Sequence, residues 1–579
     1  MLTILICIAP GASSRAPTHS ATPGITSRPM SSSRLRHGFL LLLTVVLMLP
    51  VLGVLISWVP WGENAPQALE LLLEMGRTVL PDYALTTLWL CLMVTAGVIA
   101  VGLSAAVAVT LFDFPGRKIF EWALLLPLAM PAYVVAYAYT DFLQFSGPFQ
   151  TALRELTGLQ GRVFPEIRNT VGAAWVLTFA LYPYVYLLAR AALGERANHL
   201  MEAARLLGAP MARRIREVAL PLARPAVAAG VALALMETLA DFGVSSYFGI
   251  QTFTAGIYKA WLAMDNRVAA AQLALILLLL VIGLLALERR AQQRMRFAVG
   301  RGARAGSDEA RPVPLHGKQR WLAWGVCGLP LLMGFVAPVL FMLRPLLADG
   351  SALPWERFMG WLFNSLRLGA ISAVLAVLLA LVLAFSLRRR PDRVTRAVVN
   401  LAGLGYAVPG AVIVVGLLLP VGWLQAAWPQ SQVGYVVTAT SLGLVWAYLV
   451  RFCAVALQSI QSGYSRIPVS FDDSARMLGA DGFGLLQRVH WPLLRRSTVA
   501  AALLVFVDVM KELPATLVLR PFNSDTLAVV AYQLARDERL GEAALPSLAM
   551  VLAGLIPVIL LSRTLRSPAP ERGREAVRQ

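Results

Sequence analysis

Charged residues are scarce in this sequence. They make up 14% of the 579 residues, whereas a soluble protein normally carries about 25%. A deficit of this size over so long a chain excludes an ordinary soluble protein and indicates a membrane protein. Cysteine is scarce as well. The four cysteines, Cys7, Cys91, Cys327 and Cys453, form no CxxC pair, so we interpret them as packing residues and not as disulfide partners or metal ligands.

Motifs of catalysis are also missing. The five histidines form neither an HExxH motif nor a cluster within the apolar segments, which argues against a membrane-embedded enzyme. No Gly-x-x-x-x-Gly-Lys-Ser/Thr run occurs, and the nearest candidate, Gly317-Lys318, is followed by Gln319. We therefore expect no ATP hydrolysis by this chain, no catalytic residue, no established metal site and no cofactor of its own.

Long apolar segments are abundant. A membrane-spanning helix needs about 20 apolar residues, and we expect an all-α protein with about twelve such helices. Strands are not favoured, because the segments are too long and lack alternation. The predicted spans lie near residues 38–59, 85–111, 119–140, 169–190, 223–247, 269–288, 321–345, 363–387, 397–420, 433–455, 493–517 and 543–562.

The net charge of +19 is concentrated in a few stretches. Arginines crowd Arg289–Arg320, Arg388–Arg396, Arg451–Arg496 and Arg563–Arg578, and such alternation is what the positive-inside rule produces. We interpret the charge as membrane topology, with both termini cytoplasmic, and expect no binding of nucleic acid.

The chain contains an internal repeat. Glu202-Ala203-Ala204 precedes Gly208 and then Pro221, while Asp473-Ser474-Ala475 precedes Gly479 and then Pro492. The two glycines are 271 residues apart, and so are the two prolines. Upstream, Pro131 matches Pro409 and Thr87 matches Ser365 at an offset of 278. Several positions in register indicate a duplication.

The repeat predicts the domain organisation. An even number of spans per half places equivalent loops on the same side of the membrane, so the halves are parallel repeats. We expect residues 1–29 to be disordered or a mis-assigned start. The remaining units are a first six-helix domain at 30–288, a cytoplasmic linker at 289–320, a second six-helix domain at 321–565 and a cytoplasmic tail at 566–579.

The repeated loop has a mechanical interpretation. Residues 202–211 are helix-prone but not apolar enough to enter the bilayer, Gly208 permits a turn, and Pro221 suits the first turn of the next helix. A short amphipathic helix on the cytoplasmic face is suited to docking into a groove on a partner. An ordinary solvated loop is the alternative, and two copies in register favour docking.

The first copy of the repeated loop resembles the EAA loop of ABC import permeases. The residues that carry this resemblance are Glu202, Ala203, Ala204, Gly208 and Pro221. The second copy keeps the acid as Asp473, together with Ala475, Gly479 and Pro492, but has Ser474 in place of the first alanine. The resemblance implies the type I importer membrane fold in a bacterial inner membrane. It also implies two ATP-binding subunits, which hold the ATP and Mg²⁺, and a periplasmic substrate-binding protein.

Other segments are similar to the ferric-iron permeases. They are Leu126–Tyr133, Tyr139–Phe142, Met236–Gly243, Lys511–Thr516 and Leu519–Phe522. This resemblance implies ferric iron as the substrate. Close relatives with the same plan move thiamine or other small solutes, so that alternative stays open. An ion-coupled secondary transporter is a weaker alternative, because it does not explain two matched cytoplasmic loops.

Two pairs of acids interrupt apolar segments. Glu237 and Asp241 are four residues apart, and Asp508 and Glu512 repeat them at an offset of 271. Each pair shares one helix face, and the cost of charge in a bilayer predicts that the acids face the bundle interior. They are candidates for lining a cation pathway, with Tyr133, Tyr137, Tyr139, Tyr182 and Tyr184 as further oxygen donors. Alternatively, Glu237 and Asp241 lie near a helix end, where they cap the backbone or meet arginine, and Lys511 neutralises Asp508 or Glu512.

Overall fold

The computed structural model describes residues 30–57, 65–299, 312–348, 355–480 and 482–565. The predictions for residues 1–29 and 566–579 lie outside these ranges. Nearly all of the described chain is helical, as its apolar composition requires, since a helix satisfies its backbone hydrogen bonds without help from water or lipid. The fold is the all-α membrane architecture predicted from the sequence.

The described residues of the first half form sixteen elements. Their bounds are α2 (Met30–Ser57), α3 (Ala65–Arg77), α4 (Leu80–Leu111), β1 (Phe112–Asp113), α5 (Arg117–Ala123), η1 (Leu126–Ala129), α6 (Ala132–Leu143), α7 (Pro148–Thr157), α8 (Thr170–Leu206), α9 (Met211–Arg214), η2 (Ile215–Ala219), α10 (Leu220–Ala240), α11 (Gly243–Tyr247), α12 (Phe253–Tyr258), η3 (Lys259–Ala263) and α13 (Arg267–Val299).

The described residues of the second half form seventeen elements, whose long helices follow one another in an order similar to that of the first half. Its elements are β2 (Val313–Pro314), α14 (Lys318–Leu331), η4 (Leu332–Val336), α15 (Ala337–Ala348), α16 (Trp355–Arg389), α17 (Arg393–Ala402), η6 (Gly405–Ala407), α18 (Gly410–Ala427), α19 (Val433–Ala439), α20 (Ser441–Ser465), α21 (Val469–Met477), α22 (Phe483–Leu485), η7 (Leu486–His490), α23 (Trp491–Lys511), α24 (Pro514–Leu519), α25 (Leu527–Arg536) and α26 (Leu540–Leu565).

Ten of the described helices are long and apolar enough to cross a membrane, and an eleventh span is counted if a helix pair bent by 90° forms one crossing. That pair, Arg117–Ala129 with Ala132–Thr157, contains the predicted segment 119–140. The one remaining predicted segment, 493–517, forms most of α23 and the start of α24, and α23 carries several charges in 21 residues. Its counterpart α10 belongs to one of the ten helices that are long and apolar enough to cross a membrane, Met211–Ala240.

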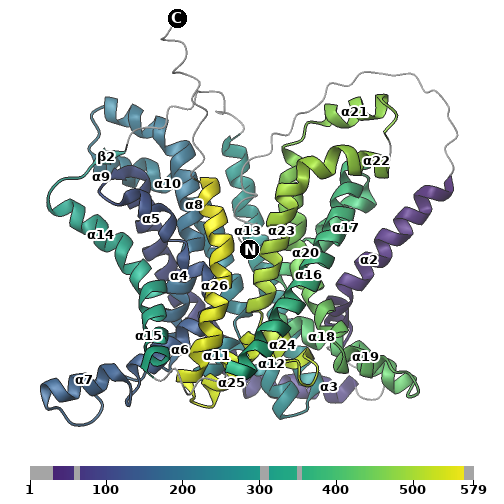
Figure 1. Ribbon diagram of the computed structural model, residues 1–579, viewed down its shortest axis with the longest axis horizontal. Coiled ribbons are helices and arrows are strands. Elements are labelled where there is room, and N and C mark those ends of the chain that lie inside the picture. Colours follow the sequence, from purple (N-terminus) through teal and green to yellow (C-terminus); the bar gives the residue numbers. More distant parts are fainter. Residues whose placement is uncertain (1–29, 58–64, 300–311, 349–354, 481, 566–579) are drawn as a thin grey trace, which may run out of the picture.

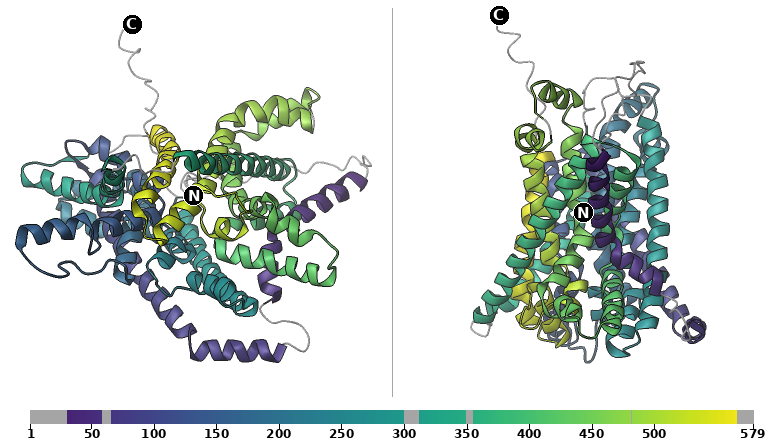
Figure 2. Two further views of the ribbon diagram at one scale, coloured as in Figure 1. Left: turned by 60° about the horizontal axis from the view of Figure 1, so that its bottom comes forward. Right: turned by 90° about the vertical axis from the view of Figure 1, so that its right-hand side faces the viewer.

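The long helices run alongside one another and both repeated loops lie at one end (Figures 1 and 2). In Figure 1, α9 and α21 mark this end at the top, where α2 also begins and α26 ends. The short helices α11, α12, α24 and α25 lie at the opposite end. Equivalent elements of the two halves therefore point the same way, as parallel repeats require.

Local geometry confirms that the halves are repeats. Pro131 and Pro409 precede α6 and α18 with nearly equal dihedral angles, φ −60° and ψ 141° against φ −58° and ψ 144°. The hydroxyl of Thr87 accepts a hydrogen bond from the backbone N–H of Phe253, and the hydroxyl of Ser365 accepts one from Leu527. Residues that were matched by sequence offset alone thus have equivalent backbone conformations and equivalent hydrogen bonds to the backbone.

The first span of each half packs on the opposite half, which the repeat did not predict. Helix α2 contacts α17, α18 and α20, while α14 contacts α4 and α15 contacts α6. Gly53 of α2 and Gly416 of α18 make the close crossing possible, because a Cβ on either would collide with the backbone of the facing helix. Such small-residue contacts are a common means of helix association in membranes.

Polar contacts fix these exchanged spans at one end. Arg36 of α2 donates to Asp392 at 2.8 Å, and Asp392 also caps α17 by accepting from the N–H of Thr395. The Thr395 and His37 hydrogen bonds hold the pKa of Asp392 well below its usual value. On the other side, β2 pairs in parallel with β1. The predicted linker, 289–320, stays a prediction as a unit, since residues 300–311 are not described; in the described residues α13 continues to Val299 and α14 begins at Lys318.

Candidate functional site

The two repeated loops end in the same backbone turn. Gly208 and Gly479 adopt φ values of +79° and +81°, in the left-handed region that favours glycine. The N–H of Gly208 donates to Arg205 O, and the N–H of Ala209 donates to Ala204 O. This pair of bonds is the Schellman motif that closes a helix C-terminus.

The second loop repeats the motif with matched residues. The N–H of Gly479 donates to Arg476 O at 3.0 Å, and the N–H of Ala480 donates to Ala475 O at 2.9 Å. Pro221 and Pro492 then lie in the first turn of α10 and α23. The structure thus places all nine predicted coupling-loop residues in two equivalent helix–turn–helix segments.

The tips of both turns expose apolar side chains. Leu206 and Leu207 are 84% and 87% exposed, and Met477 and Leu478 are both 89% exposed. Glu202 and Asp473 are exposed as well, and Asp473 forms an ion pair with Arg476 at 3.0 Å. Exposed apolar pairs at equivalent positions are typical of an interaction surface.

The loops differ in how the helix before the turn is held. Residues 202–206 are the last turns of α8, so the expected separate short helix is absent from the first loop. The second loop does contain one, α21, because Pro468 disfavours helical geometry at the preceding residue and interrupts the chain after α20. No proline lies between Val185 and Gly208, so α8 continues.

A cavity of about 190 Å³ lies between the two halves. All four predicted acids line it, together with residues of η1, α6, α8, α20 and α26. Since both halves contribute, the cavity coincides with the interface between the repeats. Its acidic lining residues are Glu237, Asp241, Asp508 and Glu512.

Asp241 and Glu512 act as caps. Asp241 accepts hydrogen bonds from the backbone N–H groups of Val244 and Ser245, at the start of α11. Glu512 accepts from the N–H groups of Ala515 and Thr516, at the start of α24. The alternative interpretation expected such a helix-end contact for Asp241, whereas the cap formed by Glu512 was not predicted.

Glu237 and Asp508 each lie one turn before these caps. The Glu237 carboxylate accepts a hydrogen bond from the Tyr406 hydroxyl at 3.0 Å. Both acids are partly buried on the lining of the cavity. Among the described residues, no group of three or more His, Cys, Asp or Glu side chains is arranged to hold a metal ion.

Two basic residues share the cavity. Lys511 Nζ donates to Leu128 O at 3.0 Å, while Arg451 lies 3.4 Å from a Glu512 oxygen. Arg451, and not Lys511, is therefore the cation that faces Glu512. Arg451 lies within α20, as the predicted span 433–455 requires, although it also opens one of the arginine-rich stretches that were interpreted as cytoplasmic.

Some lining residues were not singled out from the sequence. Tyr133 and Tyr184 line the cavity as expected, whereas Tyr137, Tyr139 and Tyr182 are not among its lining residues. Tyr406 was missed, since nothing in its local sequence marks it. Arg451 had a usable signal, because an arginine inside an apolar span is by itself a sign of function.

Comparison with known proteins adds the family. Residues 98–297 match the family of the binding-protein-dependent transport system inner membrane component. The Fe(3+)-transport system permease protein FbpB 2 of Haemophilus influenzae is 25% identical, over 90% of this chain and 97% of the relative. The probable ABC transporter permease protein y4fN of Sinorhizobium fredii is also 25% identical, over 83% and 86%.

A shorter relative matches 44% of the chain. It is the putative 2-aminoethylphosphonate transport system permease protein PhnU of Salmonella paratyphi A, which is 28% identical over 92% of its own length. A relative of that size corresponds to one half of the duplicated structure. With its two fused repeats and the matched loops, the chain is similar over most of its length to the binding-protein-dependent permeases, the inner-membrane components of ABC importers, and residues 98–297 match that family.

Proposed function

We propose that this permease imports ferric iron, which a periplasmic binding protein delivers and the central cavity conducts. One observation carries the proposal: Glu237 and Asp508, one from each repeat, line the same space between the halves. Phenol oxygens of Tyr184 and Tyr406 line it as well. Hard cations prefer oxygen ligands of this kind. The printed name of the Haemophilus influenzae relative, an Fe(3+)-transport system permease protein, supports the same substrate.

The cavity is better suited to conducting a cation than to binding it tightly. Asp241 and Glu512 already accept two backbone hydrogen bonds each, and Arg451 offsets part of the negative charge. Glu237 and Asp508 then give the lining an attraction for a cation without a closed set of ligands. Weak attraction is what conduction needs, because a tightly held ion leaves slowly.

Each repeated loop, in this proposal, docks one ATP-binding subunit, so that the complex holds two copies. The equal turns at Gly208 and Gly479 and the exposed apolar tips support equivalent docking at both loops. The end that carries the loops, the start of α2 and the end of α26 is then cytoplasmic. The opposite end, with α11, α12, α24 and α25, faces the binding protein.

The substrate is tested by uptake into proteoliposomes. The complete complex, with its ATP-binding subunits and binding protein, is reconstituted and supplied with radioactive ferric iron and internal ATP. We expect ATP-dependent accumulation that excess unlabelled ferric iron abolishes and that thiamine, sulfate and 2-aminoethylphosphonate leave unchanged. ATP-dependent accumulation of one of these other solutes in place of iron would reject the proposed substrate.

A phosphonate is the second candidate, and Arg451 and Lys511 favour it. Both cations line the same cavity as the acids, and an ammonium-bearing phosphonate carries charges of both signs. The printed name of the 28%-identical relative points to this class. Labelled 2-aminoethylphosphonate in the same vesicles separates the two candidates directly.

A further inference from the structure

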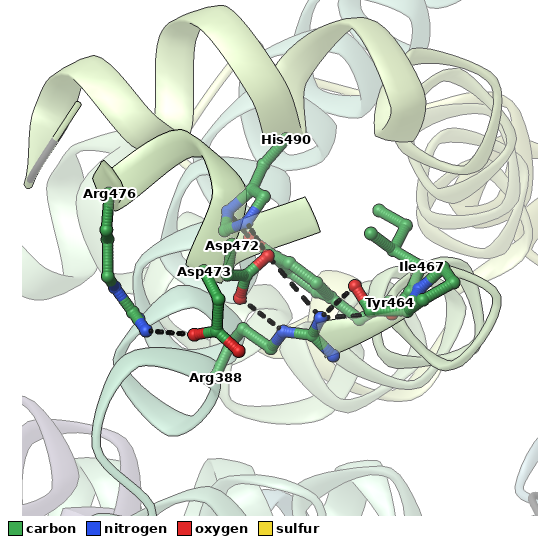
Figure 3. A network of polar contacts seen from close by, with 8 residues as sticks. Arg388, Tyr464, Ile467, Asp472, Asp473, Arg476 and His490 are labelled. Atoms are coloured by element: carbon green, nitrogen blue, oxygen red, sulfur yellow. Dashed lines mark hydrogen bonds and ion pairs between the residues drawn. The ribbon is translucent and has the colours of Figure 1, made fainter. Parts of the chain in front are cut away.

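A buried polar cluster joins the second coupling loop to the helices below it. Figure 3 shows Arg388 of α16, Asp472 of α21 and His490 of η7 converging on one point. Arg388 Nε donates to Asp472 Oδ2 at 2.8 Å, and His490 Nε2 lies 3.0 Å from Asp472 Oδ1. Helix α16 is therefore linked through one carboxylate to α21 and η7, which follow it more than 70 residues later.

The cluster is shielded from solvent. The side chains of Asp472 and His490 are 2% and 0% exposed, and that of Arg388 is 16% exposed. Tyr464 of α20 contacts the other ring nitrogen of His490 at 3.2 Å, and Phe385 packs edge-on against the ring. Burial works to raise the pKa of Asp472, but hydrogen bonds from Arg388 and His490 outweigh it and hold the pKa below its usual value.

Arg388 also bridges the interruption between α20 and α21. Its Nη2 donates to the carbonyl oxygens of Ile467 and Pro468, both at 3.0 Å. The Ile467 carbonyl lies where the chain leaves α20 and so lacks a regular helical partner, whereas the Pro468 carbonyl also accepts from the N–H of Phe471 at 3.3 Å, at the start of α21. One guanidinium thus holds both the interrupted backbone and the helix that follows it.

The first half has no such cluster at the equivalent positions. At an offset of 271, Asp472 corresponds to Met201, His490 to Ala219 and Tyr464 to Leu193, while Arg388 corresponds to Thr110 at 278. Met201, Ala219 and Leu193 are buried like their counterparts. In that half the coupling segment is the end of α8 itself and is held by the helix.

We propose that Arg388, Asp472 and His490 form a clamp that positions α21 for coupling, in place of the helix continuity that holds the first loop. The inference rests on the docking role proposed above for the two loops. His490 directly precedes Trp491, where α23 begins, and α23 ends at Lys511 on the cavity. The clamp therefore ties the second docking segment to a helix that reaches the cavity.

The first experiment measures the clamp without substrate. Trypsin is added to the purified transporter, and cleavage after the exposed Arg466 is followed by mass spectrometry of the fragments. Arg388→Lys keeps the charge but cannot hold both the Asp472 carboxylate and the two carbonyls. Loss of such charge-assisted bonds should raise cleavage after Arg466 roughly tenfold. Arg393→Lys, the same change at an exposed arginine of α17, should match the parent.

The second experiment measures coupling. Reconstituted complexes of the parent, Asp472→Asn and Arg393→Lys are compared for bound ATP-binding subunits, ATP hydrolysis and uptake of ferric iron per ATP hydrolysed. We expect Asp472→Asn to keep its subunits, because Met477 and Leu478 remain, while uptake per ATP falls several-fold. A merely structural role would lower the amount of complex and leave this ratio unchanged.

A triple variant serves as the control for misfolding of the single variants. Arg388→Thr with Asp472→Met and His490→Ala installs the residues of the first half and leaves none of the three polar groups unpaired. It should accumulate, yet show the same raised cleavage after Arg466 and the same low coupling as the single variants, since the guanidinium that held the carbonyls of Ile467 and Pro468 is gone. Parent-like cleavage and coupling in this variant would overturn the clamp. A parent that takes up no iron would instead contradict the proposed substrate, and the trypsin result would be unaffected.

Discussion

At the scale of single residues, the four acids divide by what their carboxylates contact. Asp241 and Glu512 each accept two backbone N–H groups at the start of a short helix. Glu237 contacts a tyrosine hydroxyl and, like Asp508, lies on the cavity lining. The two groups should therefore respond differently to loss of charge.

Glu237→Gln keeps shape and hydrogen bonding but removes a negative charge from the cavity. Uptake of ferric iron should fall roughly tenfold, which corresponds to about 1.4 kcal/mol on a barrier. Glu237→Gln with Asp508→Asn should be worse, because both halves line one space. Membrane content and bound ATP-binding subunits are measured alongside and should stay normal. Normal uptake by the double variant would eliminate the pathway role.

Asp241→Ala should act on stability. It removes a cap from α11 and leaves two backbone donors without their partner, at a cost of about 1–2 kcal/mol. Thermal unfolding of the detergent-purified protein should therefore occur at a lower temperature. Asp241→Asn, which can still accept these bonds, serves as the control and should lie nearer the parent. Equal melting of Asp241→Ala and the parent would show that the cap is not needed.

At the scale of elements, the coupling loops combine a fixed turn with different supports. Both turns use a glycine at positive φ, and nothing lies within 4 Å of a Cβ built on either one. Backbone conformation, and not crowding, is therefore what requires glycine here. The support is helix continuity in the first loop and an ion-paired cluster in the second.

Gly208→Val with Gly479→Val should uncouple ATP hydrolysis from uptake. A β-branched residue in the left-handed region costs about 1–2 kcal/mol at each turn, so the apolar tips would shift. Gly208→Asn with Gly479→Asn is the matched control, since asparagine tolerates this conformation. The ratio of uptake to hydrolysis is the measurement. If the valine pair couples as well as the asparagine pair, the turn geometry does not matter for coupling.

At the scale of the whole molecule, the exchange of first spans binds the halves together. Helix α2 lies against α17 and α18, and α15 lies against α6 and α26. The last spans cross as well, since α13 contacts α18 and α26 contacts η1. Helices of each half thus pack against helices of the other half, so the two halves do not form two independent helix bundles.

Two chains split between residues 299 and 312 should reassemble when coexpressed. Each first span has its apolar partner on the other chain, so an affinity tag on one half should recover the other. Coexpression of a first half that begins at residue 65, without α2, should reduce this recovery because the faces of α17 and α18 are uncovered. Equal recovery with and without α2 would contradict the importance of the exchanged span.

The sequence by itself determined the class, the duplication and the matched loops. Long apolar segments allow little besides membrane helices, and the offsets of 271 and 278 align residues such as Gly208 with Gly479 without any coordinates. It also marked the four acids, because charge in an apolar segment is costly wherever the helix lies.

Only the tertiary structure decided what each of these residues contacts. The caps at Asp241 and Glu512, the position of Arg451 beside Glu512, and the exchange of α2 and α15 depend on how helices far apart in sequence pack. The cluster of Arg388, Asp472 and His490 depends on three separate elements meeting. Hydrophobic periodicity indicates that a face is buried, but the partner of that face is chosen by packing, which local sequence does not encode.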